Sequence, residues 1–332
     1  MKVVIIVGAV LGLMSCHAAP SDEERPRPLL RIAGSRLAAG LAQELTAARP
    51  DLDVRHVAAS PLAAPGQVQK GDAELGVTFA DSVYFTQQAN TDQSSSVSPT
   101  LRAISALHVA PILLFVRSES GIRAVADIRG RVARTAPTPL ENDPRFSGWP
   151  IPRSISGRGT GTVNGITALP QLVLLAYGIT PADVRNTTLD PSKAIAEIAE
   201  GRVDAVFTVA FEANTFASEA LEQGAHLMSI EGAAVERLRR EYSFIKAVNI
   251  PAGTYPGQTA AVHTVGVTMV LVCRNDLAEQ LAYDLTRLYF EALPTISAHG
   301  DVQGIDPQQA PLTPIPLHEG AARYFRETEL FR

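Results

Sequence analysis

The best candidate for chemistry is a glycine-rich segment near the middle of the chain, SISGRGTGTVNG, at residues 154–165. Glycines alternate there with an arginine and hydroxyl side chains: Gly157, Arg158, Gly159, Thr160, Gly161 and Thr162. The spacing fits neither a P-loop nor a dinucleotide fingerprint, and no lysine follows. Thr160 or Thr162 can cap a following helix, whose open N–H groups favour a carboxylate, and Arg158 can add a bidentate contact. The alternative is a flexible loop before a helix.

A second glycine-rich segment, NIPAGTYPGQ at residues 249–258, lacks both a lysine and a following helix start. Its two prolines fix the backbone and its two glycines permit turns around Tyr255, so the segment is predicted to be a rigid connection. A phosphate cradle is not predicted here, and a contact of Tyr255 with a ligand is left open.

Other residues give no support for catalysis. No two of the seven histidines are spaced for a helical zinc pair, and His318 is interpreted as a capping or surface histidine. No G-x-S-x-G elbow is present. Cys273 lies in an apolar run and is interpreted as a small buried hydrophobe. We therefore expect no enzyme activity, no metal and no cofactor. The net charge of −5, without a basic stripe, argues against nucleic acid.

The amino terminus predicts export. An apolar run after the first lysine is shorter than the roughly 20 residues of a membrane span and suits a secretory signal. The letters LMSC resemble a bacterial lipobox, so residues 1–16 are predicted to be a signal peptide that ends at a lipidated Cys16. Ordinary cleavage near Ala18 and Ala19 is the alternative. Residues 17–28 are polar and proline-rich, which predicts a flexible tether.

The rest of the chain alternates short apolar runs with amphipathic segments, which indicates an α/β protein of about two domains. Ser35 is predicted to cap a helix that ends before Pro50, and a long helix is predicted over 275–293. Two strand-like runs over 101–117 either lead the chain from one lobe into another or extend one large sheet. The proline-rich loop 137–153 is a lid or a surface insertion.

Three segments together resemble one family, the TAXI class of substrate-binding proteins of tripartite ATP-independent periplasmic (TRAP) transporters. These are IPAGTYPGQ, then VHTVGVTMVLVCRNDLAEQLAYDLTRLYFEAL, and IPLHEGAARYFRE near the carboxyl end. The resemblance implies a two-lobed periplasmic-binding-protein fold, type II-like, with hinge strands and a ligand cleft between two α/β lobes. Lobe I would be 29–117 plus 264–332, and lobe II would be 118–263.

The implied function is a periplasmic or cell-surface receptor that captures a small organic anion and delivers it to a TRAP permease. The first guess for the ligand is an amino acid or carboxylate similar to glutamate, and only the lipidated amino terminus would touch the membrane. The alternative is a signalling or scaffold lipoprotein that keeps the receptor fold and senses a solute.

The resemblance also implies site residues. From the first lobe these are Gly34, Ser35, Ser60 and Tyr84, although packing is an equal alternative for Tyr84. From the second lobe they are the loop from Arg158 to Thr162 and Asn214, at the start of a helix. The family's Gly-Thr-Gly-Gly loop is replaced here by IAGSRLAAG. The resemblance therefore predicts the fold more specifically than the ligand.

Overall fold

The structure is a computed structural model that describes residues 27–92, 101–135, 169–187, 189, 191–210, 214–298 and 306–329. The predicted signal peptide with Cys16, most of the tether, the 137–153 loop and the loop from Arg158 to Thr162 lie outside these residues. Within the described ranges no helix is long and apolar enough to cross a membrane. The same ranges contain no cluster of three side chains suited to a metal ion.

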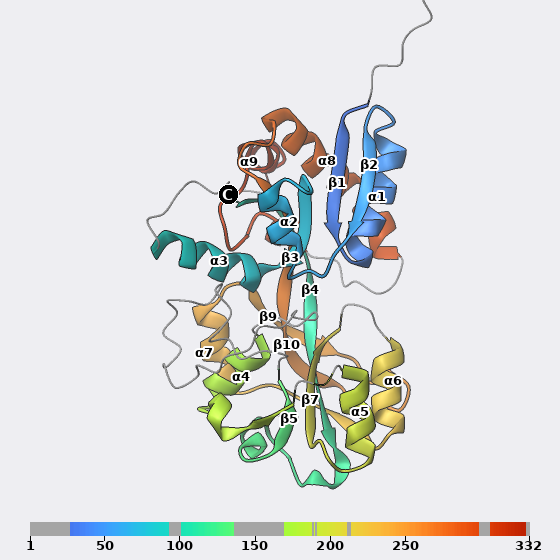
Figure 1. Cartoon of the computed structure of the whole chain (residues 1–332), viewed down its shortest axis with the longest axis vertical. Helices are drawn as coiled ribbons and strands as arrows, with labels where there is room; N and C mark the ends of the chain where they lie inside the picture. Colours follow the sequence, from blue (N-terminus) through green and yellow to red (C-terminus); the bar gives the residue numbers. More distant parts are fainter. Residues whose placement is uncertain are drawn as a thin grey trace, which may run out of the picture.

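The structure has two α/β halves, one above the other, joined by two long strands (Figure 1). Lobe I contains β1 (Leu29–Gly34), α1 (Arg36–Ala48), β2 (Asp53–Ala58), α2 (Ala64–Lys70), β3 (Leu75–Phe79), α3 (Ala80–Asp92), α8 (Glu279–Ala298) and α9 (Glu319–Glu327). Short 3₁₀ turns at Ser118–Ser120, Val125–Ile128, Pro181–Asp183 and Pro307–Gln309 complete the described elements.

Lobe II follows the same α/β alternation. It contains β5 (Val132–Arg134), α4 (Leu169–Ala176), β6 (Arg185–Asn186), α5 (Pro191–Ala199), β7 (Ala205–Val209), α6 (Asn214–Glu222), β8 (Ala225–Met228), α7 (Ala233–Glu241) and β9 (Ile245–Ile250). The two-lobed α/β fold that the sequence predicts is confirmed by this arrangement. The residue boundaries given for the two lobes stay a prediction.

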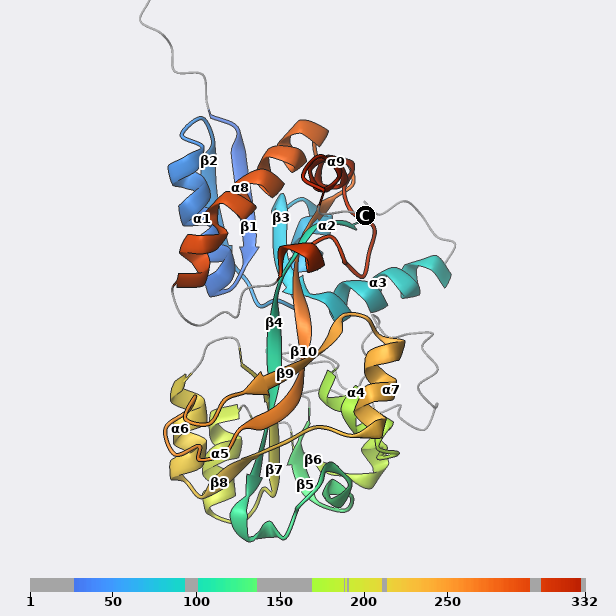
Figure 2. The same cartoon turned by 180° about the vertical axis from the view of Figure 1, so that it is seen from behind.

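The strands β4 (Leu101–Arg117) and β10 (Val262–Arg274) run through both halves (Figures 1 and 2). In lobe I, β10 lies between β3 and β4 and pairs antiparallel with both. In lobe II, β4 pairs with β7 and β8, while the first half of β10 pairs with β9. These two strands therefore connect the lobes.

The two runs expected over 101–117 form one continuous strand. Pro111 lies opposite Gly266 at the end of the β10 pairing, and from Ile112 onward β4 pairs with β7. Because a proline has no backbone N–H, it is tolerated at this change of partner, where its carbonyl still accepts from the Ala210 N–H at 2.8 Å. The proline interrupts the apolar pattern of the sequence without interrupting the strand.

The two helices that the apolar spacing predicts are both present, as α1 and α8. In α1, Ala38, Leu41 and Leu45 are buried on one face. The long helix α8 begins at Glu279, four residues later than the predicted start at 275, because the preceding residues form a turn. The loop around Tyr255 contains glycines with φ of 78° and 83° at Gly253 and Gly257, which confirms the predicted rigid turn.

Candidate functional site

The carboxyl ends of three parallel strands meet at one edge of lobe I. Gly34 at the end of β1 pairs with Ala58 at the end of β2, and β3 runs parallel to β1 on its other side. In α/β sheets, ligands bind outside the carboxyl ends of parallel strands. The residues that follow these strands, among them Ser35 and Ser60, therefore occupy the edge where a ligand is expected.

Gly34 and Ser35 bring the backbone of lobe I to this edge. A Cβ on Gly34 would lie 2.7 Å from the Cβ of Ala38, and its φ is 152°, so the close turn from β1 into α1 requires glycine. Ser35 is the N-cap residue of α1, as predicted, but its side chain makes no capping hydrogen bond. The hydroxyl is half-buried and is not used to hold the helix.

Ser60 and Tyr84 have structural contacts of their own. The Ser60 hydroxyl accepts a hydrogen bond from the Ala63 N–H at 3.2 Å and so holds the turn before α2. The half-buried Tyr84 ring packs edge-on against Phe85 and also contacts rings of lobe II. That Ser60 or Tyr84 contacts a ligand stays a prediction.

Asp81 is a residue at this edge that the sequence reading missed. It lies in the first turn of α3, directly after β3, and only 1% of it is exposed. One carboxylate oxygen accepts from the Ser82 N–H at 2.8 Å. An acidic residue at a helix start is common as a cap, so the sequence alone does not mark Asp81 as a site residue.

Lobe II presents the carboxyl ends of its own parallel strands, β5, β6 and β7. The last residue of β5 is Arg134, which is 1% exposed. Its guanidinium donates to the carbonyl of Leu189 at 2.7 Å and to the carbonyl of Phe207 at 3.0 Å. These bonds orient a positive charge inside the lobe, where the low dielectric strengthens its interactions.

Polar groups adjoin this arginine. The N–H and the hydroxyl of Thr135 both donate to the Asn186 side-chain oxygen, at 3.1 and 3.0 Å. Asn214 is the first residue of α6, as predicted for a helix start after β7, although its side chain lies outside the described part of the chain. Lobe II thus supplies a cation with hydroxyl and amide groups beside it.

Sequence reading missed Arg134 as well. The only local signal is an arginine within the apolar strand run VAR, at a position that faces inward. The carbonyls that hold it come from residues 55 and 73 positions further along the chain. That distance explains why no motif marks it.

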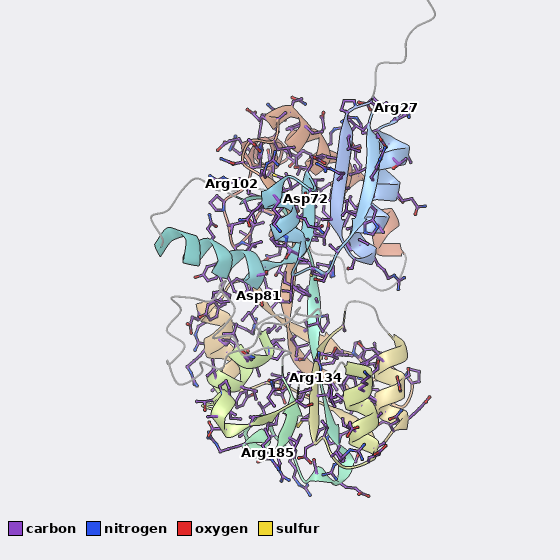
Figure 3. All side chains as sticks on the ribbon, in the orientation of Figure 1. Arg27, Asp72, Asp81, Arg102, Arg134 and Arg185 are labelled. Carbon is purple, nitrogen blue, oxygen red and sulfur yellow. The ribbon has the colours of Figure 1, made fainter. Side chains whose placement is uncertain are left out.

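The two edges are turned toward each other. Figure 3 labels Asp81 at the lower border of lobe I and Arg134 in lobe II beneath it. Lobe I thus holds a buried carboxylate, that of Asp81, and lobe II holds a buried guanidinium, that of Arg134. Such an arrangement can bind a small charged molecule by charge-assisted hydrogen bonds.

Three residues singled out in the sequence, Cys273, His318 and Tyr255, have structural roles. Burial raises the pKa of the Cys273 thiol to about 12, and the side chain is fully buried, which confirms the interpretation as a small hydrophobe. His318 accepts from the Gly320 N–H at 3.2 Å and caps α9, so of the two interpretations, a capping or a surface histidine, the structure supports the first. Tyr255 is packed into the core of lobe II.

Several solved structures resemble this chain at low identity. The periplasmic aliphatic sulphonate binding protein SsuA from Escherichia coli is 18% identical, with 82% of this chain and 77% of that chain covered and a TM-score of 0.46. The alkanesulfonate-binding protein SsuA from Xanthomonas axonopodis pv. citri is 17% identical, with coverages of 90% and 83% and a TM-score of 0.44. A protein of Streptococcus mutans described in connection with glutathione import is 12% identical, with coverages of 82% and 91% and a TM-score of 0.45.

The sequence also matches the model of a protein family. It begins at residue 154, ahead of α4, and continues to residue 328 at the end of α9. It thus includes most of lobe II, the hinge strand β10 and the two carboxyl-terminal helices. Because residues 154–328, more than half of the sequence, match it, the chain belongs to the NMT1-like family.

Proposed function

We propose that this protein is an exported receptor that binds a small organic anion between its two lobes and delivers it to a membrane permease, without chemical conversion. The observation that carries the proposal is the buried Arg134 at the carboxyl end of β5, whose guanidinium is held by the carbonyls of Leu189 and Phe207. An arginine that backbone carbonyls hold in place is preorganised to bind a carboxylate or sulfonate through two parallel hydrogen bonds.

Binding would be coupled to movement of the lobes about β4 and β10. A ligand shifts such an equilibrium only by the contacts that are better in one lobe arrangement than in the other. A ligand that touches Ser35 in lobe I and Arg134 in lobe II makes both contacts only when the lobes are close. The same ligand therefore stabilises the closed arrangement.

The ligand class follows from this chemistry. An amino acid or carboxylate similar to glutamate is the first candidate. A sulfonate carries the same charge and is named as the ligand class of both SsuA proteins. The panel for a binding test therefore contains amino acids, dicarboxylates and alkanesulfonates.

The binding test is a calorimetric titration of the purified chain against this panel. We expect Arg134→Gln to weaken binding of the best ligand at least tenfold, while Arg185→Gln, an exposed arginine of the same lobe, leaves it unchanged. Because Arg134 is buried, Ser35→Ala serves as a second variant that preserves the fold. Absence of heat across the whole panel would contradict the proposal. An unchanged affinity in Arg158→Ala would contradict only the predicted anion contact of that residue.

The permease partner is proposed to be of the TRAP type, on the strength of the TAXI resemblance. The competing class is an ATP-driven importer. An uptake assay distinguishes the two classes of permease. It uses vesicles that contain the candidate permease and adds the receptor and labelled ligand. Uptake without ATP supports a TRAP partner, and uptake that requires ATP contradicts it.

Export and lipidation at Cys16 are part of the proposal. Intact-protein mass spectrometry of the membrane fraction tests them. We expect a lipid adduct that disappears in Cys16→Ala. A mature chain that begins near Ala18 or Ala19 would show ordinary cleavage instead.

A further inference from the structure

Four aromatic rings connect the lobes beside the hinge strands. Tyr84 and Phe85 come from α3 of lobe I, and Tyr242 and Phe244 come from the segment between α7 and β9 of lobe II. The Tyr84 ring centroid lies 5.3 Å from that of Phe244 and 6.2 Å from that of Tyr242. The Phe85 centroid lies 5.9 Å from Tyr242 and 6.3 Å from Phe244. We call these residues the interlobe aromatic cluster.

Three of the four rings of the cluster are buried. Phe85, Tyr242 and Phe244 are at most 7% exposed, and Tyr84 is half-buried. Most of the ring pairs meet at steep angles, for example 83° between Tyr84 and Tyr242, which is the edge-to-face geometry that aromatic rings favour. Both views of the fold place α3 directly above α7 (Figures 1 and 2). The contact is therefore an interior packing contact between lobes.

The cluster belongs to a core that continues from one lobe into the other. One connected set of buried side chains includes lobe I residues such as Phe79 and Val83 together with Leu172 of α4 and Leu238 of α7. The core under α5 and α6, on the other side of lobe II, forms a separate set. Hydrophobic packing between the lobes is thus concentrated on the α3–α7 side.

The cluster is also tied to the hinge. The Phe244 carbonyl accepts hydrogen bonds from both the N–H and the hydroxyl of Thr268 on β10, each at 3.0 Å. Thr268 pairs with Val109 of β4, next to a register shift at which Leu107 and His108 together face Met269. A β-bulge of this kind bends the strand locally. Contacts therefore run from the Tyr84 ring of α3 through the Phe244 ring and the Phe244 carbonyl to β10, where β10 pairs with the bulged part of β4.

We propose that the interlobe aromatic cluster is the pivot of the lobe movement: it stays packed while the lobes rotate, and it limits the arrangements that the empty protein can adopt. A packed interior contact has a few discrete arrangements and does not deform continuously, so it can restrict a hinge in this way. The inference rests on the lobe movement of the proposed function, concerns the protein without ligand and is independent of which solute binds.

The test measures the distance between lobes by pulsed electron paramagnetic resonance on the full chain without ligand. Spin labels are attached at Gln43→Cys in α1 and Ala196→Cys in α5, both exposed, in a Cys16→Ser background. The native Cys273 is fully buried and is protected from labelling. The wild-type cluster is expected to give a narrow distance distribution.

Tyr84→Ala is expected to broaden that distribution and shift its maximum, because the ring that contacts both Tyr242 and Phe244 is removed. Tyr84→Phe keeps the ring and is expected to match the wild type. Phe216→Ala is the matched control, since that ring packs against Phe115 within lobe II at 5.6 Å. If Tyr84→Ala does not give one cooperative thermal transition, Tyr84→Leu replaces it. A distribution as narrow as in the wild type, in whichever of these two variants folds, would overturn the proposal, as would equal broadening in Phe216→Ala.

Discussion

Gly266 of β10 lies so close to Val109 of β4 that a Cβ on the glycine would lie 2.5 Å from the valine Cγ1. The same Cβ would lie 2.8 Å from the Ala110 carbonyl oxygen, which belongs to the backbone and cannot rotate away. This contact occurs next to Pro111, where β4 changes its pairing partner. The connection between the lobes is therefore closely packed at its centre.

Gly266→Ala should lower the free energy of unfolding by about 1–3 kcal/mol, because the strands must separate to admit the methyl group. Denaturation in urea measures the change. Gly40→Ala is the control, since a Cβ there meets nothing within 4 Å and alanine favours the helix. A Gly266→Ala variant as stable as the wild type would show that the strands can move apart at no cost.

His108 should make stability fall in mild acid. Burial lowers the pKa of His108 from 6.5 to about 4, and its Nδ1 has no hydrogen-bond partner. Below about pH 6.5 the unfolded chain binds a proton that the folded chain does not bind until about pH 4. Stability is thus complete above pH 6.5 and decreases by about 3 kcal/mol as pH falls to 4.

His108→Gln removes this contribution, so the comparison isolates it from the titration of carboxylates. Urea denaturation between pH 4.5 and pH 8 measures both proteins. As the pH falls from 8 to 4.5, the wild type should lose more unfolding free energy than His108→Gln. Parallel profiles would contradict a buried neutral imidazole at this position.

Arg117 and Asp204 form an ion pair where β4 ends. Their side chains are 23% and 11% exposed, and the Nη2 and Oδ1 atoms are 2.6 Å apart. The other Asp204 oxygen accepts from the Val132 N–H at 3.1 Å. Asp204→Asn should cost about 2 kcal/mol, because a charge-assisted bond is lost and an arginine remains without its counter-charge.

The control for this pair is an exposed one. In the pair of Asp53 and Arg55 the side chains are 38% and 65% exposed, so Asp53→Asn should cost much less stability than Asp204→Asn. A double-mutant cycle with Arg117→Met separates the coupling of the pair from other effects of each change. Equal costs at both sites would mean that burial does not strengthen the Arg117 pair.

Ser35→Ala should affect binding without affecting stability. The hydroxyl makes no capping bond, so its loss should change the free energy of unfolding by less than about 0.5 kcal/mol. A contact with a bound anion would instead appear as a loss of affinity in calorimetry.

Ser60→Ala is its matched comparison, since the Ser60 hydroxyl holds the turn before α2 and its loss should cost about 1 kcal/mol. If Ser35→Ala is destabilised as much as Ser60→Ala, the Ser35 hydroxyl has a structural role.

The elements of the fold could be predicted where a pattern is local. The spacing of Leu41 and Leu45 marks α1, Gly201 with a φ of 73° ends α5, and the apolar run into Cys273 forms β10. Each of these depends on residues within one turn or one strand. Capping by His318, one of the two roles considered for it, depends on equally local contacts.

The candidate site could be predicted only in part. Arg134 becomes a site residue through carbonyls of Leu189 and Phe207, and no spacing rule connects positions so far apart. Tyr84 could be assigned to packing or to a ligand equally well, because its ring neighbours Tyr242 and Phe244 come from a distant segment. Local patterns thus predict helices and strands, whereas tertiary contacts decide which side chains belong to the candidate site.

The pairing of β3 with β10 has a consequence for biosynthesis. Thr78 of β3 lies opposite Val270, so the edge of β3 stays unpaired until nearly the whole chain has been made. Contacts that join such distant positions form slowly, because a long loop must close first. Lobe I therefore cannot complete its sheet from the leading third of the polypeptide, whereas β5, β6 and β7 of lobe II can pair among themselves earlier. A chain truncated before β10 should expose the β3 edge and aggregate.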